Sequence, residues 1–147
     1  MSPTTDAGRK RVFTTQLDVR FGDVDPAGIA FYPKIYDMIH RAMEELFDVH
    51  VGRRYYYLIA QDKIGFPLVQ SQVEFKSPLS FGDRPVVRIT TTKVGTSSLG
   101  LHYVFTVDER TCVDARMTVV CCDLSDLHAI PIPDAFRARF LELLEEA

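Results

Sequence analysis

The order of hydrophobic patterns along the chain is the feature that most constrains its fold. Apolar residues recur at helical spacing over residues 33–47. Segments with strand patterns then follow one another without intervening long helices, at residues 68–76, 85–94, 99–107 and 111–123. One more alternating segment, 13–21, precedes the helix. A run of strands after a helix, in place of regular strand–helix alternation, predicts an antiparallel α+β sheet that curls around the helix.

Length and composition indicate one folded domain. A chain of 147 residues with 46% hydrophobic residues can bury a core of its own and is not typical of a disordered protein. We expect a disordered tail over residues 1–10, which lack the features of a signal peptide, and a single domain over 11–147. A short helix is predicted within 52–62, and a closing helix over 133–146.

Charge and apolar content exclude several functions. The net charge is -3 and the cations form no dense stripe, which argues against a nucleic-acid partner. No apolar run approaches the roughly 20 residues that a membrane-spanning helix needs. The cysteines cannot all pair, and their spacing is not that of metal ligands, so we expect a reducing, cytoplasmic location. A metal site is not expected either, because three histidines lie far apart in sequence without acidic partners: His50, His102 and His128.

Residues 21–33 carry the strongest chemical signal. Asp23 and Asp25 lie two residues apart on a turn between a predicted strand and the long helix. A carboxylate at the start of a helix lies near backbone amides that can stabilise a developing oxyanion. Aspartate also serves commonly in turns, and for Asp23 we favour that structural role. For Asp25, the surrounding motif favours a catalytic role.

The motif resembles the signature of a known family. Phe-Gly-Asp-x-Asp-Pro-Ala-Gly-Ile-x-x-Tyr-Pro, followed by a long helix, is similar to the hotdog-fold acyl-CoA thioesterases, and most to the 4-hydroxybenzoyl-CoA thioesterase branch with a catalytic aspartate. Residues 65–69 and 75–83 resemble later, looser segments of that family. The resemblance implies a five-stranded antiparallel sheet around a central helix, and no cofactor. It also implies homodimers or homotetramers with active sites at the interface between subunits.

The resemblance assigns roles to residues of the motif. The catalytic carboxylate falls on Asp25, and the backbone N–H that stabilises the oxyanion falls on Tyr32. The aromatic residue that contacts the acyl group falls on Phe31, and Gly28 joins it as a substrate-contacting residue.

The chain departs from that branch at two places. The position of the helical aspartate that receives the substrate's hydroxyl is His40 here, which we expect to line the distal end of the acyl pocket. The basic cluster of the family is reduced to one cation in residues 93–98. For coenzyme A we therefore expect contacts from Lys93, Ser97 and Lys76.

Thioester chemistry suits such a sparse set of groups. A thiol with a pKa near ~8.5 leaves as thiolate without a general acid. An ionised aspartate can act as general base or as nucleophile, and one oxyanion donor is typically worth roughly 2.7–4 kcal/mol. The sequence therefore predicts hydrolysis of an acyl-CoA thioester with an aromatic or short acyl group, and it does not distinguish base from nucleophile.

Other interpretations stay open at this point. The chain could bind acyl-CoA without hydrolysing it. It could also resemble the hotdog enoyl-CoA hydratases, in which a histidine–aspartate pair acts on an enoyl thioester. No histidine adjoins Asp25 in sequence. A second thioesterase branch places its catalytic glutamate on the central helix, where Glu44 and Glu45 are the candidates; Glu44 shares a helix edge with Tyr36 and His40.

Overall fold

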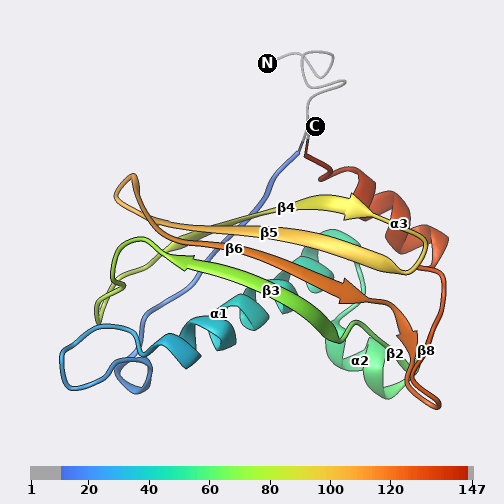
Figure 1. Cartoon of the computed structure of the whole chain (residues 1–147), viewed down its shortest axis with the longest axis horizontal. Helices are drawn as coiled ribbons and strands as arrows, with labels where there is room; N and C mark the ends of the chain where they lie inside the picture. Colours follow the sequence, from blue (N-terminus) through green and yellow to red (C-terminus); the bar gives the residue numbers. More distant parts are fainter. Residues whose placement is uncertain (1–10, 146–147) are drawn as a thin grey trace.

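The computed structural model describes residues 11–145, and the tail expected over residues 1–10 lies outside them. A curved antiparallel sheet covers one long helix, α1 (Tyr32–Glu45) (Figure 1). The sheet has the strand order β1-β4-β5-β6-β3. Its strands are β1 (Phe13–Gln16), β3 (Leu68–Phe75), β4 (Val86–Val94), β5 (Ser98–Val107) and β6 (Arg110–Val120). The predicted α+β architecture, with five strands around a central helix, is confirmed.

Helix α1 buries one face under the sheet. Its buried residues recur at helical spacing and are Ile35, Met38, Ile39, Ala42 and Met43. The helix continues into a wider helical segment, η3 (Leu46–Val51), which ends at Gly52. Gly52 has a φ of 90°, a left-handed conformation that glycine adopts at helix ends without steric cost. Helical backbone therefore extends to Val51, four residues beyond the predicted end at Phe47.

The central strands alternate as their patterns predict. Leu101, Tyr103 and Phe105 of β5 are buried, as are Val113 and Ala115 of β6. These side chains form the layer that faces α1. Strands β5 and β6 pair in a hairpin that closes at Asp108 and Glu109. Both turn residues have positive φ, which matches the right-handed twist of the flanking strands.

The two edge strands differ from expectation. β1 ends at Gln16, and the chain continues beside the segment that precedes β4, with Leu17 and Val19 donating hydrogen bonds to the carbonyl oxygens of Pro85 and Asp83. The alternation predicted for β3 leaves no buried face, because Val73 is its only half-buried residue in the described chain. Nothing in the described part of the chain covers this edge.

A smaller sheet was not predicted. It consists of β2 (Ile64–Gly65), β7 (Cys122–Asp123) and β8 (His128–Ala129), and it lies near helix α2 (Tyr55–Ala60) (Figure 1). The strand predicted over residues 111–123 is thus interrupted between β6 and β7. Cys121 and Cys122 are both buried, where the sequence indicated only one, because Cys122 lies between β2 and β8.

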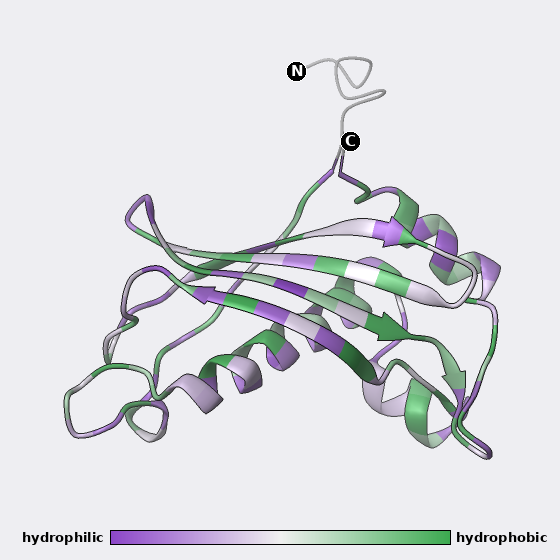
Figure 2. Cartoon of the chain, viewed as in Figure 1, coloured by the Kyte–Doolittle hydropathy of each residue, from purple (hydrophilic) through white to green (hydrophobic). Residues whose placement is uncertain are grey.

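Helix α3 (Asp134–Leu141) closes the fold and is shorter than predicted. The chain after it pairs with β4: Thr91 donates to Leu143, and Glu145 donates to Thr91. Phe140 of α3 joins an aromatic cluster around Phe47, whose ring centroid lies 5.1 Å from that of Tyr55, 5.3 Å from Phe66 and 5.7 Å from Phe140. Figure 2 shows apolar residues along the strands and on α1.

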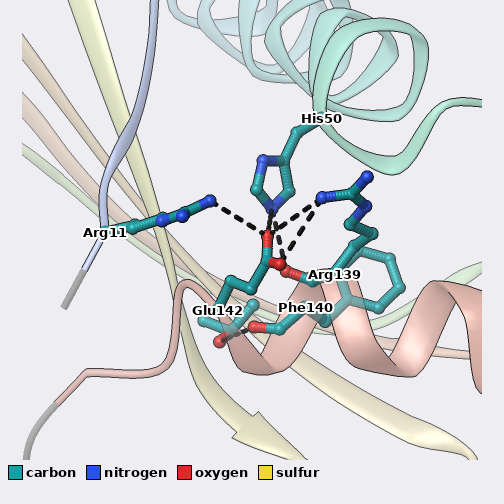
Figure 3. Close-up of polar contacts among 6 residues, drawn as sticks. Arg11, His50, Arg139, Phe140 and Glu142 are labelled. Atoms are coloured by element: carbon teal, nitrogen blue, oxygen red, sulfur yellow. Dashed lines mark hydrogen bonds and ion pairs between the residues drawn. The ribbon is translucent and has the colours of Figure 1, made fainter. Parts of the chain in front are cut away.

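His50 and His102 have acidic partners that are remote in sequence, whereas the sequence indicated no acidic partner for either histidine. His50 Nε2 lies 2.8 Å from the Arg139 carbonyl oxygen and 3.3 Å from Glu142 Oε1, so it ties η3 to α3 (Figure 3). His102 Nε2 lies 2.9 Å from Asp114 Oδ1, and its Nδ1 contacts Glu145.

Within residues 11–145, no group of three histidine, cysteine, aspartate or glutamate side chains has metal-binding geometry. No helix in this range is long and apolar enough to cross a membrane.

Candidate active site

The loop before α1 is held by Asp23. Its carboxylate is buried, accepts a 2.9 Å hydrogen bond from the Arg20 amide, and lies 3.4 Å from Arg41 of α1. Its backbone carbonyl accepts a 3.0 Å hydrogen bond from the Phe31 amide. Asp23 therefore fixes both ends of the motif loop against the helix, which agrees with the structural role favoured for it.

Asp25 lies at the tip of this loop in a tight turn. Its Oδ1 accepts a 2.9 Å hydrogen bond from the Ala27 amide, and its carbonyl accepts one from Gly28. Gly28 has a φ of 82°, which the turn requires and which a residue with Cβ would adopt only with strain. Among the described residues, Oδ2 of Asp25 has no hydrogen-bond partner. One carboxylate oxygen is therefore held by the loop, and the other is free to meet water or substrate.

The start of α1 presents one free amide. Phe31 N–H donates to Asp23, and Lys34 N–H donates to the Phe31 carbonyl at 2.7 Å. Pro33 has no N–H. Within residues 11–145, the Tyr32 N–H has no backbone acceptor, as expected for a first helical residue. It carries the partial positive charge of the helix start and can stabilise an anion.

Asp25 and Tyr32 line one cavity of about 610 Å³. Phe31 and Lys76 also line it, so four residues predicted from the sequence are brought together. Gly28 shapes the loop and is not among the lining residues. Sequence reasoning missed most of the opposite wall, although the loose family motif around residues 75–83 contains all of it except Val113. That wall comprises Phe75, Ser77, Pro78, Leu79 and Val113.

His40 lies in a second cavity, two helical turns further along α1. This cavity has a volume of about 310 Å³ and is mainly apolar. His40 Nε2 lies 3.3 Å from Glu44, and both side chains are about half exposed. Strand β3 lines both cavities, with Phe75 at the cavity of Asp25 and Leu68 at the cavity of His40. The two cavities therefore follow one another along the seam between α1 and β3.

The other predicted residues lie elsewhere. Glu44 and Glu45, the alternative catalytic carboxylates, line a polar cavity of about 360 Å³ on the outer side of α1. Lys93 and Ser97 flank the β4–β5 turn near α3, at the opposite end of the sheet from the start of α1 (Figure 1). This chain alone does not bring them to Asp25, and their contact with coenzyme A stays a prediction.

Comparison with known proteins relates this geometry to a family. A sequence model of the thioesterase-like superfamily matches residues 19–140, which include the motif loop, α1 and all strands that line the two cavities. The chain belongs to the thioesterase-like superfamily.

Curated relatives and solved structures agree with this assignment. A 1,4-dihydroxy-2-naphthoyl-CoA hydrolase of Nostoc punctiforme is 28% identical over 83% of this chain and 82% of the relative. One from Thermosynechococcus vestitus is 29% identical over 90% of each chain. The structure of a gentisyl-coenzyme A thioesterase has 31% identity and a TM-score of 0.77, and the match covers 88% of this chain and 99% of the other. The protein is thus a thioesterase with the hotdog fold.

Proposed function

We propose that this thioesterase hydrolyses an aromatic acyl-CoA, with Asp25 as the catalytic carboxylate and the Tyr32 N–H as the oxyanion donor. One observation carries the proposal: Asp25 and Tyr32 line the same cavity, and among the described residues one carboxylate oxygen of Asp25 and the Tyr32 N–H have no hydrogen-bond partner. A carboxylate and an oxyanion donor are the minimal set for cleaving a thioester.

In the proposed reaction, the thioester carbonyl oxygen accepts a hydrogen bond from the Tyr32 N–H. Asp25 either removes a proton from a water molecule that attacks the carbonyl carbon, or attacks that carbon directly. Direct attack gives a mixed anhydride, which water then hydrolyses. On either route the C–S bond breaks and coenzyme A leaves as thiolate, which needs no general acid. The helix start stabilises the charge that develops on the carbonyl oxygen.

Two features support an aromatic acyl group. The relatives named above act on dihydroxynaphthoyl-CoA and gentisyl-CoA. In this chain, Phe31, Tyr32 and Phe75 line the cavity and offer aromatic surfaces to a ring. The rise of α1 separates Tyr32 from His40 by about 12 Å, so a bulky acyl group can extend along the helix towards the second cavity. A short acyl group would stay beside Tyr32.

A panel of acyl-CoA thioesters tests this function. Release of coenzyme A is followed with a thiol-reactive dye for benzoyl, naphthoyl, acetyl, butyryl and palmitoyl thioesters. We expect kcat/KM for the best aromatic thioester to exceed that of every aliphatic one by at least about tenfold. A ratio of this size is expected when a pocket that fits an aromatic ring selects among apolar acyl groups. A clear preference for an aliphatic thioester would contradict the aromatic assignment.

The same panel tests the alternative of a module that binds acyl-CoA without hydrolysing it. A module that only binds acyl-CoA would release no thiol from any thioester. A hydratase would need a histidine next to the carboxylate, and no histidine in the described chain lines the Asp25 cavity.

For coenzyme A, we propose that Lys76, which is half exposed at this cavity, contacts a phosphate group.

The free edge of β3 supports the predicted assembly. Within residues 11–145, β3 pairs only with β6, and Leu68, Val69 and Phe75 are each more than half exposed. An open edge with exposed apolar residues is a template for strand pairing. We propose that two copies pair through β3, next to both cavities.

Light scattering after gel filtration measures the assembly. We expect a mass of two or four times the 16.7 kDa of one chain. Val69→Lys, which places a charge on the β3 edge, is expected to reduce that mass. Glu74→Lys is the control: it introduces a lysine on the same strand at a position that is already charged, and it should leave the mass unchanged. A 16.7 kDa species for the unmodified protein would contradict the proposal.

A further inference from the structure

The second cavity along α1 contains a buried phenol that the fold itself does not use. Tyr103 of β5 is only 1% exposed and lines this cavity of about 310 Å³. No hydrogen bond to its phenol oxygen is present among residues 11–145. The only fully enclosed side-chain nitrogen or oxygen without a partner in the same residues is Arg41 Nε. The Tyr103 oxygen is therefore not sealed in the core, and its remaining access is through the cavity that it lines.

The other polar groups of this cavity have partners. The Tyr55 hydroxyl accepts a 3.2 Å hydrogen bond from the Phe66 amide. The Tyr36 hydroxyl lies 3.5 Å from Ser71, and His40 is paired with Glu44. Of the hydroxyl groups that line this cavity, only that of Tyr103 makes no hydrogen bond to a described residue. Ligand pockets are typically apolar with a few polar groups that orient the ligand, and a phenol that opens onto an apolar cavity without a protein partner is a group of this kind.

The surroundings define which ligand group fits. Apolar and aromatic side chains dominate the cavity walls, among them Ile39, Met43, Phe66, Met117 and Val119. Burial raises the pKa of Tyr103, so its hydroxyl stays protonated and neutral at physiological pH. An ionised carboxylate would lose its hydration in such a cavity, whereas a neutral hydroxyl on an aromatic ring can both donate to and accept from a phenol.

We propose that the Tyr103 hydroxyl binds a ring hydroxyl of the acyl group and thereby makes the enzyme selective for hydroxylated aromatic acyl-CoA thioesters. This inference rests on the proposed function, because it takes the thioester to lie at Asp25 and the ring to extend along α1 into the second cavity. Tyr103 acts in specificity and takes no part in the chemical step. His40, at the exposed end of the same cavity, contacts the ring without selecting for its hydroxyl.

The variant Tyr103→Phe tests the inference with matched thioesters. For wild type we expect kcat/KM for at least one ring-hydroxylated benzoyl or naphthoyl thioester to exceed that of its unsubstituted counterpart by about tenfold or more. Tyr103→Phe should abolish this ratio and leave kcat/KM for the unsubstituted thioester within about twofold of wild type. Tyr56→Phe, which removes an exposed hydroxyl, should leave both values unchanged.

A structural role of the phenol would give a different result. Because the hydroxyl has no partner within the described chain, Tyr103→Phe should not lower the melting temperature. A lowered melting temperature with an unchanged hydroxyl preference would overturn the inference. So would loss of the preference in His40→Ala together with its retention in Tyr103→Phe.

Equilibrium binding separates this inference from the proposed function. The probes are non-hydrolysable coenzyme A analogues in which a methylene group lies between sulfur and the aromatic carbonyl, with and without the ring hydroxyl. Titration calorimetry should show tighter binding of a hydroxylated analogue to wild type and equal binding of the pair to Tyr103→Phe. This outcome without any thioester hydrolysis would refute the proposed function and support Tyr103. Equal binding of each pair to wild type would refute the Tyr103 inference even if hydrolysis occurs.

Discussion

Replacing Asp25 by Asn is expected to lower kcat for the best thioester by roughly 10²–10⁴-fold, the usual contribution of a positioned base. The substitution is nearly isosteric, and the amide oxygen can still accept the hydrogen bond from the Ala27 N–H that holds the loop. What it removes is the charge and basicity of the free carboxylate oxygen. KM should change much less than kcat, because the cavity keeps its shape. The measurement is steady-state release of coenzyme A.

A matched control is available on α1. Asp37 is an exposed carboxylate one turn into the helix, paired with Arg41, and it does not line the Asp25 cavity. Asp37→Asn removes the same charge close to the site and should leave kcat within about twofold of wild type. Asp25→Asn with unchanged kcat would show that the catalytic carboxylate lies elsewhere, and Glu44→Gln would then be the variant to measure.

The largest effect on stability is expected for Phe47→Ala. Phe47 is fully buried at the junction of α1 and η3, and its ring packs against Tyr55, Phe66 and Phe140. These rings come from α2, the segment after β2, and α3, so a cavity at Phe47 loosens three connections at once. Truncating a buried phenylalanine typically costs about 3–5 kcal/mol of unfolding free energy. Urea denaturation followed by circular dichroism measures it.

Tyr56→Ala provides the control for Phe47→Ala. Tyr56 lies on neighbouring α2, but 71% of its surface is exposed. Its truncation should change the unfolding free energy by about 0.5 kcal/mol or less. A loss below about 1 kcal/mol for Phe47→Ala would contradict the view that this aromatic cluster holds the helices to the sheet.

The sequence predicts much of the fold because local patterns and tertiary structure agree. The buried residues of α1 recur as its periodicity requires, and Leu101 to Phe105 of β5 alternate as expected. The predicted and observed elements differ where tertiary contacts, and not the local sequence, determine the structure. The small sheet of β2, β7 and β8 consists of two-residue strands, which are too short to carry a pattern. The sequence of β3 alternates as that of a half-buried strand does, but no described part of the chain covers it, so all its residues except Val73 are exposed.

The candidate site divides in the same way. Residues 23–33 are contiguous, so their motif brings Asp25 and Tyr32 to one cavity of the structure. Phe75 and Leu79 reach the same cavity across the fold, through hydrogen bonds such as that from Ala30 to Leu79, and no local pattern indicates this. Tyr103 is read from sequence as one more core residue of a strand. Only its position in a cavity, without a hydrogen-bond partner in the described chain, distinguishes it.

The central claim is that Asp25 and the Tyr32 N–H act together on the thioester carbonyl. A crystal structure of the protein with the non-hydrolysable aromatic analogue tests it most directly. The account predicts the analogue's carbonyl oxygen at about 2.7–3.2 Å from the Tyr32 nitrogen, within hydrogen-bonding distance, and its carbonyl carbon beside the free oxygen of Asp25. An analogue whose carbonyl binds away from both groups, for example in the cavity lined by Glu44 and Glu45, would contradict the claim.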